Sequence, residues 1–121
     1  MNKHNTVKKS KDFSSIIKEG HYFKNKSYVI YIKDNNLDKY RFGISVSKKL
    51  GNAVYRNKYK RQLRFIIDKY KKCYQNSVDY IIIIRNGYIN LNFEDKEKDY
   101  VYLINKIVNY LKKEIINEEK K

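Results

Sequence analysis

The stretch KKLGNAVYRNKYKRQLR, residues 48–64, contains seven basic residues and no acidic one. Asn52 is a typical helix N-cap, and the apolar residues after it recur with the period of a helix, which predicts a helix over about residues 53–74. The basic and amide side chains of this helix gather on one side of a helical wheel, opposite the apolar ones. The apolar stripe, which we expect in the core, consists of Tyr55, Tyr59, Leu63, Ile66, Ile67 and Tyr70.

The positive charge is local and of one sign. From Lys39 to Ile67 the chain has nine basic residues and no acidic one, and the whole chain carries a formal net charge of +15. Surface helices that are merely solvated usually interleave the two signs. Because Lys and Arg neutralise phosphates and release counterions, the basic stripe predicts binding to nucleic acid. A solvated face and a membrane surface remain alternatives, although the apolar stripe is only as wide as a domain core needs.

The bulk composition narrows the class of protein. A length of 121 residues predicts a single domain over residues 1–121, with residues 1–9 as a loosely ordered basic arm. The single cysteine, Cys73, excludes an intrachain disulfide and a cysteine-based zinc site, which suits a reducing, cytoplasmic location. No apolar run approaches the roughly 20 residues of a transmembrane helix.

The pattern of apolar and turn residues predicts an α+β fold with the element order α-β-β-β-α-β-α. We expect a two-layer sandwich, in which helices pack mainly on one side of a roughly four-stranded sheet and leave the other face open to a ligand. The second and third strands should form a hairpin. The expected elements are a helix over 10–20, strands over 21–24, 27–33 and 40–47, the basic helix, a strand over 79–84 buried on both faces, and a helix over 98–116.

The basic stretch resembles the signature of the protein subunit of bacterial ribonuclease P. That signature runs here through Ser45-Val46-Ser47-Lys48-Lys49, Gly51-Asn52-Ala53-Val54, Arg56-Asn57-Lys58, Lys60-Arg61 and Arg64. Asp12-Phe13 in the first helix and Arg41-Phe42-Gly43 before the signature extend the resemblance. It covers nearly the whole chain and weakens after Gly87.

The resemblance implies an RNA-binding subunit that is not itself the catalyst. In this family a catalytic RNA, using Mg²⁺ bound chiefly by that RNA and the substrate, hydrolyses a phosphodiester to remove the 5′ leader of precursor tRNA. The protein would bind the leader and raise substrate and metal affinity. The resemblance also implies a left-handed βαβ crossover, and it implies no organic cofactor, no membrane and no obligate protein partner.

The resemblance implies two groups of site residues and no catalytic or metal-binding residue in the protein. The RNA-binding group is Lys48, Lys49, Asn52, Arg56, Asn57, Lys58, Lys60, Arg61 and Arg64. The leader-binding cleft lies between the first helix and the open sheet face, where Phe13, Ile17 and Tyr31 occupy family positions; Tyr28, on the same strand as Tyr31, is expected to contribute to it. Ile17 stands where the family often has a second aromatic, and it can pack but cannot stack. Lys58 replaces an arginine and keeps the charge without the bidentate fork.

Two other functions stay open from the residues alone. A ribosomal-type structural RNA-binding protein of similar fold would bind RNA without a catalytic partner. A DNA-binding module of the helix-turn-helix kind would need a short helix before the basic helix, whereas the sequence predicts a strand there. The acidic residues at 94–99 could be a metal site, but they are more simply explained as carboxylates that complement a helix N-terminus.

Overall fold

The computed structural model describes residues 5–119, without the side chains of residues 116–119. The element order is the predicted one, with short helical turns added. The elements are α1 (Ser10–Glu19), β1 (His21–Lys24), β2 (Tyr28–Asp34), β3 (Arg41–Val46), the 3₁₀ turn η2 (Lys48–Leu50), α2 (Ala53–Lys69), the 3₁₀ turn η3 (Lys71–Cys73), β4 (Val78–Ile84), α3 (Asn86–Ile89) and α4 (Phe93–Glu119).

The four strands form one mixed sheet in the order β1-β2-β4-β3. β2 pairs with β1 and with β4 in antiparallel fashion, whereas β3 pairs with β4 in parallel. The predicted hairpin between the second and third strands is therefore wrong, because β4 lies between them. β4 is the most apolar strand, and the central position buries both of its faces, as expected for a continuous apolar run.

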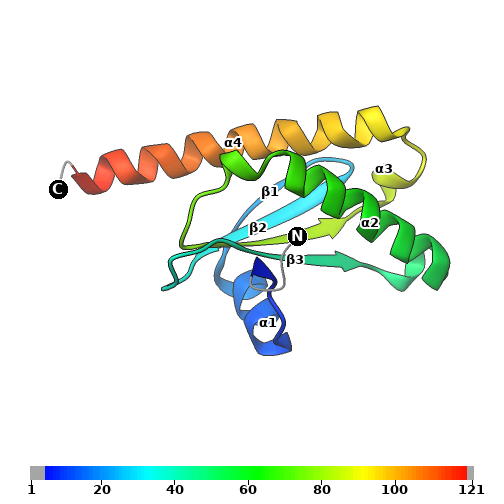
Figure 1. Cartoon of the computed structure of the whole chain (residues 1–121), viewed down its shortest axis with the longest axis horizontal. Helices are drawn as coiled ribbons and strands as arrows, with labels where there is room; N and C mark the ends of the chain where they lie inside the picture. Colours follow the sequence, from blue (N-terminus) through cyan, green and yellow to red (C-terminus); the bar gives the residue numbers. More distant parts are fainter. Residues whose placement is uncertain (1–4, 120–121) are drawn as a thin grey trace.

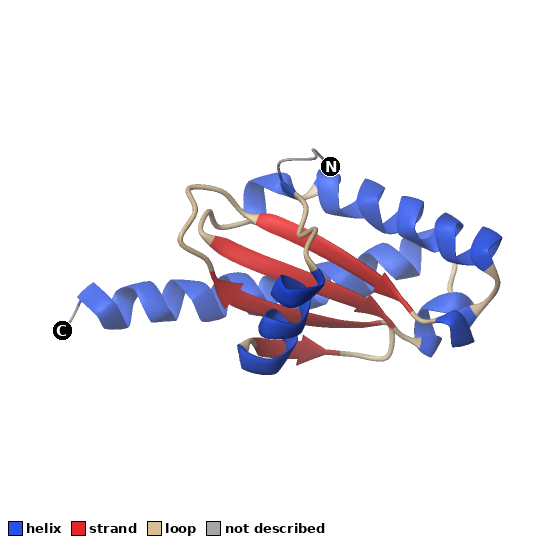
Figure 2. Cartoon of the chain, turned by 90° about the horizontal axis from the view of Figure 1, so that it is seen from below, coloured by secondary structure: helices blue, strands red, loops and turns tan. Residues whose placement is uncertain are grey.

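Helices cover the two faces of the sheet unequally (Figure 1). α2 and α4 lie on one face, and the shorter α1 crosses the other, where it stands in front of the strands in Figure 2. The predicted α+β class is confirmed, and α1 adds a partial third layer. We call the side of the sheet under α2 and α4 the core face and the opposite side the α1 face.

The core face is rich in buried tyrosines, and the hydroxyls of Tyr28, Tyr74, Tyr80, Tyr88 and Tyr100 are hydrogen-bonded within the protein. Tyr28 donates to the carbonyl of Lys96 at 2.7 Å, and Tyr88 donates to Gln62 Oε1 at 2.7 Å. The Tyr74 hydroxyl is 2.6 Å from that of Tyr100. A buried hydroxyl without a partner would cost about 1–3 kcal/mol, so these bonds allow the large rings to fill the core.

A smaller apolar cluster holds α1 on its face of the sheet. Ile16 packs there with Val7 and Ile81, and all three are buried. Val7 also donates a backbone hydrogen bond to the carbonyl of Phe42 at 2.8 Å, and Thr6 forms a parallel bridge with that residue. The prediction of a loose arm over residues 1–9 is therefore wrong for residues 6 and 7, because the apolar side chain of Val7 is buried against Ile16 and Ile81. Residues 1–4 lie outside the described part.

Two helix boundaries differ from the predicted ones. α2 ends at Lys69, and the chain continues through η3 instead of reaching residue 74. α4 begins at Phe93, five residues before the predicted start, because Asn92 caps it: the Asp95 backbone N–H donates to Asn92 Oδ1 at 2.8 Å. The acidic residues Glu94 and Asp95 thus lie in the first turn of α4, where they complement the helix dipole.

Candidate nucleic-acid interface

The cationic part of the molecule is the outer side of α2 together with η2. Lys48, Lys49 and Arg64 are exposed, while Tyr59 and Leu63 point into the core. The amphipathic division predicted for this helix is confirmed for most positions. We call the basic and amide side chains on this side of the molecule the basic surface: Lys48, Lys49, Asn52, Arg56, Asn57, Lys58, Lys60, Arg61 and Arg64. Arg56 and Lys60 are partly buried, and the others are exposed.

The local chain geometry presents both lysines of η2 beside the start of α2. Leu50 is buried and anchors the turn, and the Lys49 N–H donates to Ser47 Oγ at 3.2 Å. Gly51 then has a φ of 147°, a conformation that L residues with side chains rarely adopt. The glycine of the motif therefore redirects the chain from η2 into the helix.

Asn52 caps α2 with its side-chain oxygen, which leaves only its amide nitrogen to bind a ligand. Its Oδ1 accepts from the backbone N–H groups of Val54 at 3.1 Å and Tyr55 at 3.2 Å. The exposed side chain keeps its amide hydrogens for an external acceptor, such as a phosphate oxygen. Asn52 can thus join the basic surface as a donor while it caps α2.

Two aromatic residues of α2 are exposed, although apolar side chains of an amphipathic helix are expected in the core. Tyr55, predicted in the core stripe, is mostly exposed, since it lies in the first turn of α2 against Gly51. Phe65 is also exposed and packs edge to face with Phe93, with 5.9 Å between the ring centroids. The helical period alone could not distinguish Tyr55 from the buried Tyr59.

Arg56 differs from the other arginines of the basic surface. It is partly buried, and its Nε has no hydrogen-bond partner within the part of the chain that the structure describes. A covered donor without an acceptor is unfavourable by about 1–3 kcal/mol. An external acceptor that engages this guanidinium would therefore relieve a cost present in the protein alone.

The second predicted site, the leader cleft, lies on the α1 face. Phe13 and Tyr31 are brought together there, both partly buried against the cluster of Val7, Ile16 and Ile81. Phe13 lies directly over Gly43, since a Cβ built on that glycine would be 2.5 Å from the ring. Any larger residue at position 43 would push the ring and the helix away from the sheet. Ile17 is 37% exposed and is not part of this cluster.

Tyr28 does not line the leader cleft, so that prediction is wrong. Side chains alternate between the faces of a strand, and Tyr28 and Tyr31 are three positions apart, so they point to opposite faces. Tyr28 accordingly lies on the core face with no exposed surface, together with Ile30. Tyr31 lies on the α1 face.

Ion pairs fix α1 to the sheet near both of its ends. Arg41 donates to Asp79 through Nε at 2.8 Å and through a terminal nitrogen at 2.6 Å, and it reaches Asp12 at 3.7 Å. The hydrogen bonds that Arg41 donates to the Asp79 carboxylate raise the pKa of Arg41. At the other end Lys33 pairs with Glu19 at 2.7 Å, which lowers the pKa of that carboxyl. Asp12-Phe13 and Arg41-Phe42-Gly43 thus form one structural clamp.

Tyr22, which is not among the predicted site residues, lies on the α1 face beside Tyr31. The two residues are cross-strand partners in the register of β1 and β2, and their ring centroids are 5.8 Å apart. Tyr22 is 56% exposed. The sequence could have predicted this pair, because the short turn between HYFK and the next strand fixes the register in which Tyr22 lies opposite Tyr31.

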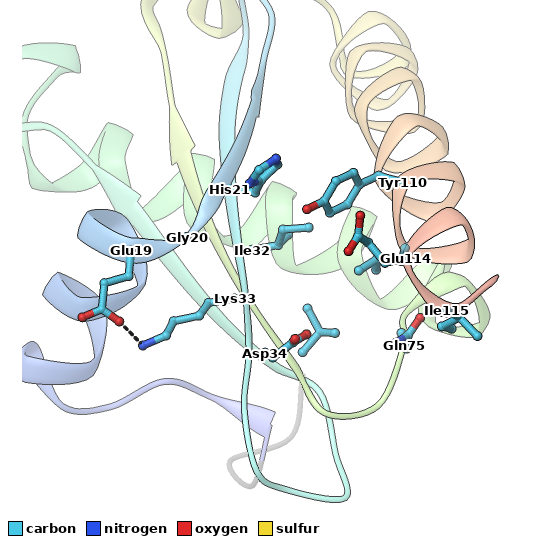
Figure 3. A pocket seen from close by; sticks show the side chains of 12 residues that line it. Glu19, Gly20, His21, Ile32, Lys33, Asp34, Gln75, Tyr110, Glu114 and Ile115 are labelled. Atoms are coloured by element: carbon cyan, nitrogen blue, oxygen red, sulfur yellow. Dashed lines mark ion pairs between the residues drawn. The ribbon is translucent and has the colours of Figure 1, made fainter. Parts of the chain in front are cut away.

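A cavity of about 480 Å³ lies away from both predicted sites, between the end of α1, β2 and the C-terminal half of α4. Its wall includes Glu19, Asp34 and Glu114, and also His21 and Tyr110, whose rings are stacked with their centroids 4.7 Å apart (Figure 3). Among the described residues, no group of three or more His, Cys, Asp or Glu side chains is placed to hold a metal ion. None of the helices within residues 5–119 has the length and apolar character of a membrane span.

Comparison with known proteins identifies the family. The ribonuclease P family model matches residues 1–108. The ribonuclease P protein component of Streptococcus pneumoniae serotype 4 is 42% identical over 104 residues, which are 86% of this chain and 85% of that one. A Staphylococcus aureus RNase P protein structure has 36% identity and a TM-score of 0.79, over 85% of this chain and 94% of that one. The Thermotoga maritima RNase P protein has 28% identity and a TM-score of 0.76, over 84% and 96%.

All of these matches are to proteins of one kind, the ribonuclease P protein. Neither the ribosomal-type protein nor the DNA-binding module is favoured by them. The chain belongs to the ribonuclease P protein family, whose members are the RNA-binding protein component of a ribonucleoprotein endoribonuclease that processes tRNA.

Proposed function

We propose that the basic surface binds the RNA subunit of ribonuclease P and that the α1 face holds the 5′ leader of precursor tRNA. The observation that carries this proposal is the separation of two surfaces of different chemistry. One is cationic and lies on the solvent side of α2; the other is aromatic and lies across the sheet, between α1 and β2. The first suits a folded RNA with many phosphates, and the second suits a single strand whose bases can stack.

The residues of the leader site have the chemistry that a single strand requires. Phe13 and Tyr31 offer rings for stacking, and the ion pairs of Arg41 with Asp12 and of Lys33 with Glu19 hold α1 against the sheet. Ile17 can contribute apolar contact only. The stacking surface is thus supplied by the strand more than by the helix.

In this proposal the RNA subunit carries out the chemistry. Phosphodiester hydrolysis would use Mg²⁺ held chiefly by that RNA and by the substrate. The described residues offer no cluster of carboxylates for such an ion, and the positive field of the basic surface disfavours a cation there. The protein would lower the metal requirement by offsetting phosphate charge that Mg²⁺ otherwise neutralises.

Precursor tRNA is therefore the proposed substrate of the complex, and the cytoplasm, where bacterial tRNA is made, is the proposed location. We propose neither a membrane nor an obligate protein partner. The net charge of +15 supports a polyanionic partner, because such a partner offsets the repulsion among the positive charges.

The deciding experiment is reconstitution with a bacterial ribonuclease P RNA at low Mg²⁺. Cleavage of a precursor tRNA is measured with RNA alone, with protein alone and with both. We expect leader release to require the RNA and to rise strongly when the protein is added. A protein that binds the RNA tightly without stimulating cleavage would contradict the leader-binding role, and cleavage by protein alone would contradict the assignment of chemistry to the RNA.

A further inference from the structure

Tyr22 is an exposed aromatic residue on the edge strand β1. β1 is a short edge strand of four residues, and the ring of Tyr22 is 56% exposed. Burial therefore explains little of its presence. An exposed tyrosine that faces a proposed ligand site is more informative than one isolated on the surface.

The ring of Tyr22 continues the aromatic surface of the leader site. Tyr22 and Tyr31 are directly opposite in the antiparallel register, and their rings are tilted by 46° with centroids 5.8 Å apart. Tyr31 in turn belongs to the same cluster as Phe13. The three residues thus form a path from α1 over β2 to the edge of the sheet.

A cation accompanies the outer end of this path. Lys24 lies two residues after Tyr22 on the same side of β1, and its Nζ is 6.0 Å from the centroid of the Tyr22 ring. Sites for single-stranded nucleic acid combine aromatic platforms with cations that follow the backbone. The pair therefore has both groups that one unpaired nucleotide requires.

We propose that Tyr22 is a stacking platform for one additional unpaired nucleotide of the leader, beyond the one held by Tyr31. The bound strand then crosses edge strand β1, and Lys24 contacts its phosphate. This inference rests on the proposed leader-binding function of the α1 face. It makes Tyr22 a residue that sets how many leader nucleotides the protein contacts.

The test uses the complete complex of protein and ribonuclease P RNA. Its affinity is measured for mature tRNA and for precursors whose leader is shortened one nucleotide at a time. The variants are Tyr22→Ala, Tyr22→Leu and Tyr22→Phe, with Tyr31→Ala for comparison. The matched control is Tyr102→Ala, because Tyr102 is a 54% exposed tyrosine of α4 with Lys106 at 4.5 Å from its ring.

We expect Tyr22→Ala and Tyr22→Leu to weaken binding of long-leader precursor by about fivefold or more, the lower end of one base–aromatic stack. Binding of mature tRNA should not change. The effect should disappear at a different leader length from that of Tyr31→Ala, since the two rings hold different nucleotides. Tyr22→Phe and Tyr102→Ala should behave like the unchanged protein.

Each other outcome contradicts a defined part of the proposal. If Tyr31→Ala shows a leader-dependent loss and Tyr22→Ala does not, Tyr22 is no platform and the leader-binding function stands. An equal loss for mature tRNA would make Tyr22 a structural residue. If the effects of Tyr22→Ala and Tyr31→Ala disappear at the same leader length, the two rings do not hold different nucleotides, and the additional nucleotide is contradicted. If neither variant depends on the leader, the proposed function itself fails.

Discussion

On the core face of the sheet, Tyr28 and Tyr100 have buried rings and hydroxyls that bond to protein atoms. On the α1 face, by contrast, Tyr22 and Tyr31 are at least partly exposed, and Lys24 lies beside Tyr22. β2 contributes to both, with Tyr28 on the core face and Tyr31 on the α1 face. The same residue type three positions apart thus serves packing in one case and is available to a ligand in the other. Residue type alone does not assign a role, whereas strand parity does.

Replacing Tyr28 by alanine should produce the largest effect on this comparison. The ring is fully buried and its hydroxyl bonds to the Lys96 carbonyl, so we expect a loss of about 3–5 kcal/mol in the free energy of unfolding. Tyr31→Ala should cost only about 1–2 kcal/mol, because that ring is partly exposed. Urea denaturation of both variants measures the difference, and equal losses would contradict the division into two faces.

Removing the clamp should have the next largest effect. Arg41→Ala leaves the Asp79 carboxylate, whose side chain is 5% exposed, without its bidentate partner, and we expect a loss of about 2–3 kcal/mol. The matched control is Lys98→Ala, because its pair with Glu94 at 3.6 Å is exposed and contributes less than about 0.5 kcal/mol. If both variants unfold at the same urea concentration, the Arg41 pair does not stabilise the fold.

Tyr31→Ala should sharpen the comparison on the binding side. We expect it to cost about 1–3 kcal/mol of affinity for precursor tRNA and little for mature tRNA, because only the precursor has a leader to stack. Affinities of the reconstituted complex for the two RNAs measure this. A similar loss for both RNAs would mean that Tyr31 only supports the structure.

The smallest effect is expected on the basic surface. Arg64→Ala and Arg56→Ala should each reduce the salt dependence of RNA binding by roughly one phosphate contact, a change of about 0.7–0.9 in the logarithmic slope. Lys112→Ala, an exposed lysine in the C-terminal half of α4, is the control and should leave the slope unchanged. Unaltered slopes in both arginine variants would exclude these residues from the interface.

Much of the fold could be predicted from the sequence because its elements have strong local signals. The period of α2 and the apolar run of β4 determine those elements. The strand order could not be derived in the same way, since β2 and β3 are consecutive in the chain and look like a hairpin. The continuous apolar run of β4 already indicated a central strand, and a central strand needs a neighbour on each side.

The candidate site was predicted unevenly for a similar reason. Charge on α2 is a property of one helix, so its sidedness could be predicted from the sequence. The leader face depends on three elements at once, and a strand register is needed to decide which side chains share it. That is why Tyr28 was included wrongly and Tyr22 was missed.

The tyrosine-rich core has a spectroscopic consequence. The chain has 13 tyrosines and no tryptophan, so its near-ultraviolet absorbance is almost entirely phenolic. Burial raises the pKa of Tyr80 to about 12, against about 10 for a phenol in water, so the stability that this tyrosine contributes is complete below pH 10 and is lost as the pH rises through 12. Alkaline unfolding should therefore be accompanied by an increase in tyrosinate absorbance. This absorbance measures exposure of the core without any added label.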